Sequence, residues 1–390
     1  MTPLTKKSSG KGIVSALDRV DWDFPRAGTW ANALHSLHWF PGNFIPQIPS
    51  YLVQLLSADS EVVFDPFCGS CTTGVEAVIL GRTAWMSDFS PVSDLISRAK
   101  LGLLTDKTGR EELHFVELPP LLAASHTTPY SEKDAPHLQQ WFHPDTLDQL
   151  SRLWNFIVER KDCTIRNTLE MLFSDTLFAC ASTLRSRTES GKARRHHWGW
   201  IADNVCPKPP QWHDAVGHFE KRLHRAKLIT SRLPLYEAGF DVRREDVRTC
   251  SYDSNSVDLV VTSPPYLGMI DYTTANRLTY LWHGWDIAVD RVSEIGARFR
   301  RNHLAEAEKY LLDVEAAVSQ ILRVLKRGGF CAIVIGSSRK YPGMALNVIS
   351  AFRRQMELVW GPRERVPTRR RVSDRKGSTP IEYICVLRKG

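Results

Sequence analysis

The stretch Asp65-Pro-Phe-Cys-Gly-Ser-Cys-Thr-Thr73 decides the fold class because of what stands on either side of it. The residues before it predict a short buried strand over 61–65 that ends in an acid, and those after it predict a helix over 73–80 that Gly81 ends. A glycine-bearing turn at such a junction lets a ligand approach the backbone. The free amides at the start of the helix suit a carboxylate or a phosphate.

The order of predicted elements around this turn is that of an α/β sheet. A helix over 44–57 precedes the turn, and a strand over 83–88 and a helix over 91–101 follow it. The pattern resumes with strands at 240–244, 257–262 and 330–335, helices at 305–325 and 344–356, and a closing antiparallel pair at 358–360 and 381–387. The pair Gly328-Gly329 is expected to stop the helix over 305–325. Alternating strands and helices predict an open, mostly parallel, doubly wound sheet.

The remaining segments differ in composition from this α/β part. Residues 1–25 are rich in Lys, Ser and Gly and predict a flexible tail. Residues 104–234 carry helix-like segments between proline-rich stretches and predict an inserted, mainly helical module, a candidate for target recognition. The α/β domain then comprises 26–103 and 235–390.

The charge balance favours a polyanionic partner. The 390 residues include 51 Lys and Arg against 43 Asp and Glu, a net charge of +8, and basic side chains that bind a phosphate backbone release its counterions. One basic run is interleaved with aromatic residues, which suits phosphate contact and base stacking, and another lies between the last two predicted strands. The candidate nucleic-acid-binding residues are Lys192, Arg194 and Arg195 in the first run and Arg369, Arg370 and Arg371 in the second. An exposed loop is the alternative interpretation of each run.

The chain carries neither an apolar run near the roughly 20 residues that span a bilayer nor, within 1–12, the apolar stretch of a signal peptide. We therefore expect a soluble, cytoplasmic protein with no membrane partner and with reduced cysteines. Cys68 and Cys71 form a C-x-x-C pair, but no second pair or nearby Cys/His partner completes a zinc site. We interpret both as small residues of the turn and expect no metal.

Asp88 ends the second predicted strand, about 20 residues after the turn, where an acid can hold ribose hydroxyls. The phosphate-binding pattern G-x-G-x-x-G is absent because Cys71 stands two positions after Gly69, and a P-loop lysine is absent as well. The expected ligand is therefore a nucleoside, bound without a loop that contacts a pyrophosphate.

The second motif is Thr262-Ser-Pro-Pro-Tyr266, at the carboxyl end of the strand predicted over 257–262. Ligands of open α/β sheets bind at the carboxyl ends of strands. Two prolines make the turn rigid, so that Ser263 and the carbonyl of Pro264 can accept hydrogen bonds from an amino group. Tyr266 offers a ring on which a planar base can stack. An ordinary rigid turn is the alternative interpretation.

The two motifs resemble those of bacterial S-adenosylmethionine-dependent DNA amino-methyltransferases that act on cytosine N4 or adenine N6. That family carries D-P-F-x-G-S-G-T-T and (S/D/N)-P-P-(Y/F/W). The segment Leu37-His-Trp-Phe-Pro-Gly-Asn-Phe-Ile-Pro46 also resembles the family's H-x-Y-P-A-K-F segment, and the similarity covers about 37–101 and 240–388. It implies a class I (Rossmann-like) methyltransferase fold with a mostly parallel seven-stranded sheet and a helical insertion.

The resemblance also implies S-adenosyl-L-methionine as cofactor and a role for each matching residue. Asp88 would bind the ribose, and Asp246 would meet the adenine amino group. The methionine part and the closure of the cofactor site would involve Phe40, Pro41, Asn43, Asp65, Phe67, Gly69, Ser70, Cys71 and Thr72. The target base would be held by the catalytic residues Ser263, Pro264, Pro265 and Tyr266.

Three features depart from the family pattern. Cys71 replaces a glycine and would crowd the cofactor if that position needs a positive φ. Asn43 replaces a lysine. The insertion precedes the third strand, whereas the usual arrangement places target recognition nearer the catalytic motif.

The implied reaction is direct methyl transfer from a sulfonium to an exocyclic amine of a base in DNA, with no covalent enzyme intermediate. Ser263 at the first catalytic position favours cytosine N4 over adenine N6. Two alternatives stay open: a methyltransferase acting on an RNA base, and a catalytically weak nucleic-acid-binding subunit. A companion restriction endonuclease would fit a DNA methyltransferase in a bacterial or phage setting.

Overall fold

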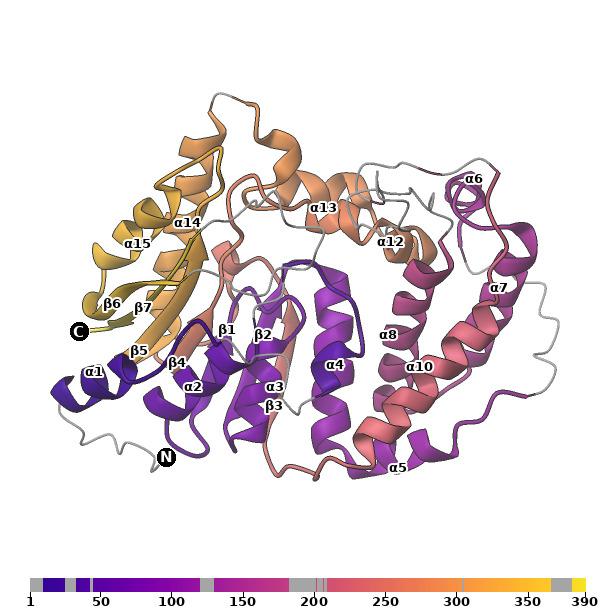
Figure 1. The fold of residues 1–390 in the computed structure, drawn as a ribbon, viewed down its shortest axis with the longest axis horizontal. Coiled ribbons are helices and arrows are strands. Elements are labelled where there is room, and N and C mark those ends of the chain that lie inside the picture. The colour runs from indigo at the N-terminus through magenta and orange to yellow at the C-terminus, as the bar shows by residue number, and fades with distance from the viewer. Residues whose placement is uncertain are drawn as a thin grey trace.

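The computed structural model describes residues 10–24, 33–42, 45–119, 130–181, 201, 206, 209–303, 305–365 and 381–390. Its centre is a seven-stranded sheet in the order β3-β2-β1-β4-β5-β7-β6 (Figure 1). β7 is antiparallel to both of its neighbours, and all other neighbouring strands are parallel. The strands are β1 (Val62–Asp65), β2 (Thr83–Asp88), β3 (Phe240–Arg244), β4 (Val257–Thr262), β5 (Leu325–Gly336), β6 (Glu357–Arg365) and β7 (Glu382–Arg388). The mostly parallel α/β sheet of a class I fold is thereby confirmed.

Successive residues of the central strands point to opposite faces of the sheet. On β1, Val63 packs into one apolar core and Phe64 into the other, and on β4 Val261 and Val260 divide in the same way. Side chains alternate along a strand with a period of two, so a strand covered on both faces needs a continuous apolar run. This requirement explains why the central strands were predictable from such runs.

Helices cover both faces. α2 (Gln47–Leu56), α3 (Thr72–Ile79) and α4 (Pro91–Thr105) pack on one face, and α14 (Glu306–Val324) and α15 (Met344–Arg353) pack on the other. All five were predicted. The structure extends α4 to Thr105, past the predicted end, and begins α2 at Gln47, after the predicted start.

The glycine pair after α14 does not act as predicted. The helix ends at Val324 and β5 begins directly at Leu325, so Gly328 and Gly329 lie inside the strand. A Cβ atom at Gly329 would lie 2.9 Å from the carbonyl oxygen of Asp258 on β4. Glycine is needed here because it lets the two strands approach closely, and the β4–β5 register shifts at this place.

Helices also occupy the described part of 104–234, at the right of Figure 1. They are α5 (Lys107–Phe115), α6 (Ala135–Gln139), α7 (Pro144–Val158), α8 (Cys163–Cys180) and α10 (Ala215–Thr230). α8 packs along α4, and its Asp175 accepts a hydrogen bond at 2.8 Å from the backbone of Trp39. These helices share one apolar core with α4, and their part in target recognition remains a prediction.

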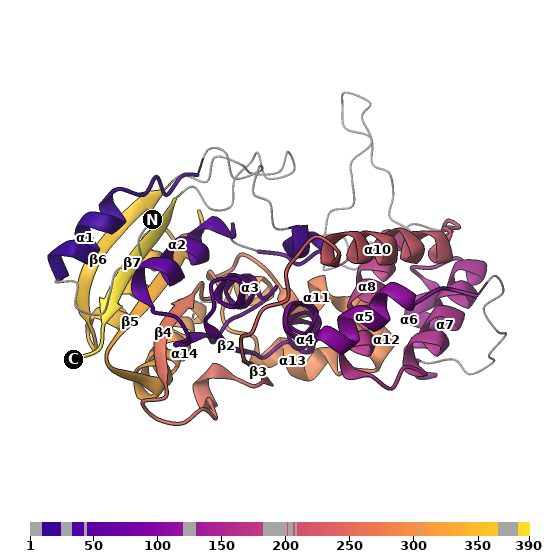
Figure 2. The ribbon, with the colours of Figure 1, turned by 90° about the horizontal axis from the view of Figure 1, so that it is seen from below.

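The N-terminal segment is not a flexible tail where the structure describes it. α1 (Gly10–Asp18) buries Leu17 and packs against β6, as Figure 2 shows. Asp18 accepts a hydrogen bond at 2.8 Å from the indole Nε1 of Trp360. The polar composition of 1–25 concealed the apolar residues Ile13 and Leu17, whose spacing of four places them on one face of a helix.

Three short helices follow the serine–diproline motif: α11 (Tyr272–Ala275), α12 (Arg277–His283) and α13 (Ile287–Ser293). They connect β4 to α14 above the carboxyl ends of the strands. Within the described ranges, none of the helices combines the length and the apolar composition that crossing a bilayer requires.

Candidate active site

Asp65 joins the two motifs. Its carboxylate accepts hydrogen bonds from the hydroxyl of Thr73 at 2.7 Å and from the hydroxyl of Thr262 at 2.6 Å. Because β1 and β4 are neighbouring parallel strands, their carboxyl ends meet at this point. The glycine turn and the serine–diproline corner therefore leave the sheet side by side. Burial raises the pKa of the Asp65 carboxyl to about 6.

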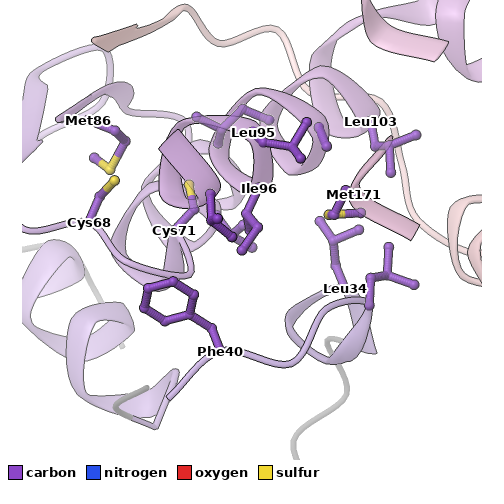
Figure 3. Packing of buried hydrophobic residues seen from close by; sticks show 14 of the residues in the cluster. Leu34, Phe40, Cys68, Cys71, Met86, Leu95, Ile96, Leu103 and Met171 are labelled. Carbon is purple, nitrogen blue, oxygen red and sulfur yellow. The ribbon is translucent and has the colours of Figure 1, made fainter. Parts of the chain in front are cut away.

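The glycine turn is held by a ring and by an acid. Gly69 has a φ of 49°, and a Cβ atom there would lie 3.2 Å from the ring of Phe40. Figure 3 shows Phe40 beside the turn that carries Cys68 and Cys71. Asp88 accepts hydrogen bonds at 2.9 Å from the backbone N–H of Gly69 and at 2.9 Å from that of Ser90. Burial raises the pKa of the Asp88 carboxyl to about 6.

Cys71 does have a positive φ, but its side chain is turned away from the ligand side of the turn. Its φ is 64°, and it caps the N-terminus of α3. The thiol is buried, with Sγ 2.7 Å from the place that a Cβ atom on Gly74 would take. Cys71 is not among the residues that line the cleft, because the left-handed backbone directs its side chain into the core. Its predicted place in the cofactor site stays a prediction.

A cleft with an empty volume of about 870 Å³, its open mouth included, lies over the two motifs. Ten of the predicted site residues line it: Phe40, Pro41, Phe67, Gly69, Ser70, Thr72, Asp88, Asp246, Ser263 and Pro265. One cleft therefore contains both the glycine turn with Asp88 and the serine–diproline corner.

Other predicted site residues are not among those that line the cleft. Asp65 is buried and holds the turn by accepting hydrogen bonds from the backbone N–H of Phe67 and the hydroxyl of Thr73, and its predicted contact with the cofactor stays a prediction. Pro264 is buried and Tyr266 is half-buried in the corner. The hydroxyl of Tyr266 lies 3.4 Å from Oγ of Ser263 and 3.5 Å from Oε1 of Glu382. That Pro264 and Tyr266 contact a base stays a prediction.

Seven predicted residues lie outside the part of the chain that the structure describes, and their roles stay predictions. They are Asn43, Lys192, Arg194, Arg195, Arg369, Arg370 and Arg371.

Asp246 lines the cleft but is already paired. Arg248 donates from Nε to both carboxylate oxygens of Asp246 at 3.0 Å. The same guanidinium bonds Asp313 at 2.6 Å and the carbonyl of Ser293 at 3.0 Å. A carboxylate has about four acceptor positions, so Asp246 keeps limited capacity for the predicted adenine contact. Arg248 fixes this wall of the cleft.

Glu294 forms a wall of the cleft that no motif indicated. Its carboxylate accepts hydrogen bonds from the backbone N–H groups of Tyr272 at 2.7 Å and Thr273 at 3.1 Å, at the start of α11. Burial raises its pKa to about 7. The ring of Tyr272 also stacks on Phe40, with centroids 6.0 Å apart. Chain segments distant in sequence thus close the cleft.

Lys100 was also missed. It lies on α4, and its side chain is fully buried. The apolar residues around it in the sequence predict a helix that packs on the core, but they do not indicate a functional lysine. Its ammonium group donates a hydrogen bond to the carbonyl of Ser70 in the glycine turn. Burial lowers the pKa of this ammonium group to about 8.

Two type II methyltransferases are distantly similar to this chain. No protein-family profile matches the chain. It is 22% identical to the type II methyltransferase M.MjaII of Methanocaldococcus jannaschii, over 82% of this chain and 76% of the relative. It is 23% identical to the type II methyltransferase M.MvaI of Kocuria varians, over 67% of this chain and 59% of the relative. The chain is a distant homologue of these type II methyltransferases.

The alignment covers less than two thirds of the length of M.MvaI. A solved structure of a SAM-dependent methyltransferase from Methanosarcina mazei is 8% identical, over 86% of this chain and 94% of that chain, with a TM-score of 0.33.

Homology to methyltransferases implies S-adenosyl-L-methionine as cofactor, and the residues of the cleft fit this molecule. Asp88 supplies an acid at the end of β2, where ribose hydroxyls can be held. The rings of Phe40 and Phe67 and the side chains of Val247 and Ile295 supply apolar surface for a purine. Thr72 opens α3, whose first backbone amides suit the carboxylate of the methionine part.

Proposed function

We propose that this protein transfers a methyl group from S-adenosyl-L-methionine to the exocyclic amino group of a base in DNA, and that cytosine N4 is preferred over adenine N6. The observation that carries the proposal is the single cleft that contains Asp88 and Gly69 on one side and Ser263 and Pro265 on the other. Distant homology to type II methyltransferases supports it.

The cofactor site comprises the glycine turn, Asp88 and the apolar walls. When bound there, S-adenosyl-L-methionine supplies an electrophilic methyl group on a positively charged sulfur. Asp88 accepts hydrogen bonds from the ribose, and Glu294 holds the start of α11 as part of the wall. Direct transfer needs no cysteine nucleophile. The buried thiols agree with this, because burial raises the pKa of Cys71 to about 11 and also raises that of Cys68.

The serine–diproline corner orients the base. Ser263 and the carbonyl of Pro264 accept hydrogen bonds from the N–H groups of the exocyclic amine. These bonds favour a pyramidal nitrogen and stabilise the positive charge that develops on it. Holding the amine in place supplies effective molarity. In a duplex the base has to be flipped out, at a cost of a few kcal/mol, which stacking on Tyr266 partly offsets.

The preference for cytosine N4 rests on the serine at position 263, since an aspartate at this place is more usual for adenine. The proposed setting is a restriction–modification system of bacterial or phage kind, with DNA as the substrate. A companion restriction endonuclease and a cytoplasmic location belong to this proposal.

Transfer of isotope-labelled methyl from S-adenosyl-L-methionine tests the proposal. Duplex DNA, single-stranded DNA and RNA are offered separately, and the products are digested to nucleosides for mass spectrometry. We expect N4-methyl-2′-deoxycytidine among the nucleosides from DNA. Label found as N6-methyladenine in DNA would show that adenine and not cytosine is the target. Label found in RNA alone would show that the substrate is RNA and not DNA. Cofactor binding without transfer to any of the three would indicate a catalytically inactive subunit.

A further inference from the structure

Two loops meet beside the serine–diproline corner. One is the segment 296–303 before α14, and the other is the segment 337–343 between β5 and α15. The hydroxyl of Tyr341 donates a hydrogen bond at 2.6 Å to the carbonyl of Arg301, and Nζ of Lys340 donates one at 2.5 Å to Oδ1 of Asn302. These contacts join loops that follow neighbouring parallel strands, β4 and β5.

The joined loops rest on the chain that continues from the corner. A Cβ atom at Gly268, two positions after Tyr266, would lie 3.1 Å from Cβ of Arg301 and 3.4 Å from the ring of Tyr341. The N–H of Gly268 bonds the carbonyl of Gly296 at 2.8 Å. The backbone that carries Arg301 is therefore held at a defined place relative to the corner.

Charge is distributed unequally within the first loop. Arg300 is buried, and its Nε bonds both carboxylate oxygens of Glu306, at 3.0 and 3.1 Å. Its other nitrogens bond the carbonyls of Val292 and Glu294. Arg300 is thus used inside the protein, where it anchors the loop, and is not available to a ligand.

The neighbouring cations are not buried against a carboxylate in this way. Arg301, Arg339 and Lys340 are exposed, and in the described part of the chain none of the three pairs with a carboxylate. We call these three residues the basic lip. Three cations on anchored loops make a surface suited to a polyanion, because little backbone entropy is lost when it binds.

We propose that the basic lip binds phosphates of the DNA strand that carries the target base. The inference rests on the proposed function. A base held at Ser263 leaves its own strand outside the cleft, next to the loop that packs on Gly268. Backbone contacts of this kind set the position of a protein on DNA without reading sequence. The lip therefore contributes affinity and register, and the segment that recognises the sequence lies elsewhere.

The test is the salt dependence of binding to a mixed-sequence DNA duplex, measured by fluorescence anisotropy with the full chain. The variant combines Arg301→Gln, Arg339→Gln and Lys340→Gln. Each lost phosphate contact lowers the slope of log affinity against log salt by about 0.9, so the slope should fall by roughly 2 to 3. Affinity at about 50 mM salt should fall on the order of 100-fold. Cofactor affinity should stay unchanged, because none of the three residues lines the cleft.

The matched control is Arg232→Gln, an exposed arginine in the segment between α10 and β3, which enters the amino end of the sheet. It should leave the slope and the affinity unchanged. An unchanged slope in the triple variant, or an equal loss of affinity in the control, would contradict phosphate binding by the basic lip. The proposed function would still hold if the wild type methylates DNA. A wild type that binds RNA and not DNA overturns both.

Discussion

Nζ of Lys100 lies 2.9 Å from the backbone carbonyl oxygen of Ser70 and donates a hydrogen bond to it from a fully buried position. A buried ammonium group is costly unless it is paired or hydrogen-bonded. Among the residues that the structure describes, no carboxylate lies close enough to make Lys100 part of an ion pair. The hydrogen bond instead holds the turn whose other residues, Gly69 and Thr72, line the cleft. Lys100 is therefore a positioning residue for the cofactor turn.

Lys100→Met should weaken cofactor binding by on the order of tenfold, because the carbonyl of Ser70 loses a charge-assisted hydrogen bond. Removing the buried charge should leave the melting temperature close to that of the wild type. Isothermal calorimetry and thermal denaturation measure the two effects. Lys107→Met, at an exposed position on α5, is the control and should change neither. A normal dissociation constant in the Lys100 variant would contradict the positioning role.

Cys71→Gly should leave cofactor affinity within about twofold of the wild type, because the thiol faces the core and not the cleft. Two changes in stability oppose each other. Glycine relieves a left-handed strain of roughly 1 to 2 kcal/mol, and the loss of a small buried side chain costs a similar amount. Chemical denaturation should therefore show a net change of about 1 kcal/mol or less. A marked gain in affinity would mean that the side chain does crowd the cofactor.

Asp88→Asn should weaken cofactor binding at pH 7.5 and reduce its dependence on pH. The pKa of Asp88 is raised to about 6, so at pH 5 only about a tenth of the carboxyl is ionised. In the wild type, affinity should therefore fall as the pH drops from 7.5 to 5. Asp65 and Glu294 also titrate in this range, with pKa values of about 6 and about 7. The contribution of Asp88 is the difference between the two pH profiles, and identical profiles would exclude the ribose role.

Ser263→Ala should slow methyl transfer by about 100-fold, the typical effect of losing one hydrogen bond that acts on developing charge. Cofactor affinity should change little. Single-turnover kinetics with labelled cofactor separate the chemical step from binding. Ser319→Ala, on the exposed side of α14, serves as the control. Full activity in the Ser263 variant would remove the hydroxyl from the mechanism.

Tyr266 allows its ring and its hydroxyl to be tested separately. Tyr266→Ala should weaken binding of the target base by roughly 1 to 3 kcal/mol, the contribution of one base–aromatic stack. Tyr266→Phe keeps the ring and loses only the long contacts to Ser263 and Glu382. It should retain most of the activity. If the two variants lose activity equally, the hydroxyl and not the stacking surface is what matters.

Local patterns were enough to predict most strands and helices and both motifs. The central strands are covered on both faces, so short apolar runs such as 259–261 mark them directly. The turn at Gly69 and the corner at Ser263 each depend on adjacent residues, and their place at strand ends predicted that they would share one edge of the sheet. The polar residues of 1–25 concealed α1 because too few apolar positions stand out there.

Packing between distant segments decided the rest. The direction of the Cys71 thiol depends on one backbone dihedral, and the roles of Lys100 and Glu294 depend on α4 and α13 lying against a turn and a helix far away in the chain. Arg300 and Arg301 are adjacent and chemically alike, yet one is buried against Glu306 and the other is exposed. The spacing of apolar residues along the sequence predicts which face of a helix or strand a side chain occupies. Only the arrangement of the elements determines which groups that face meets.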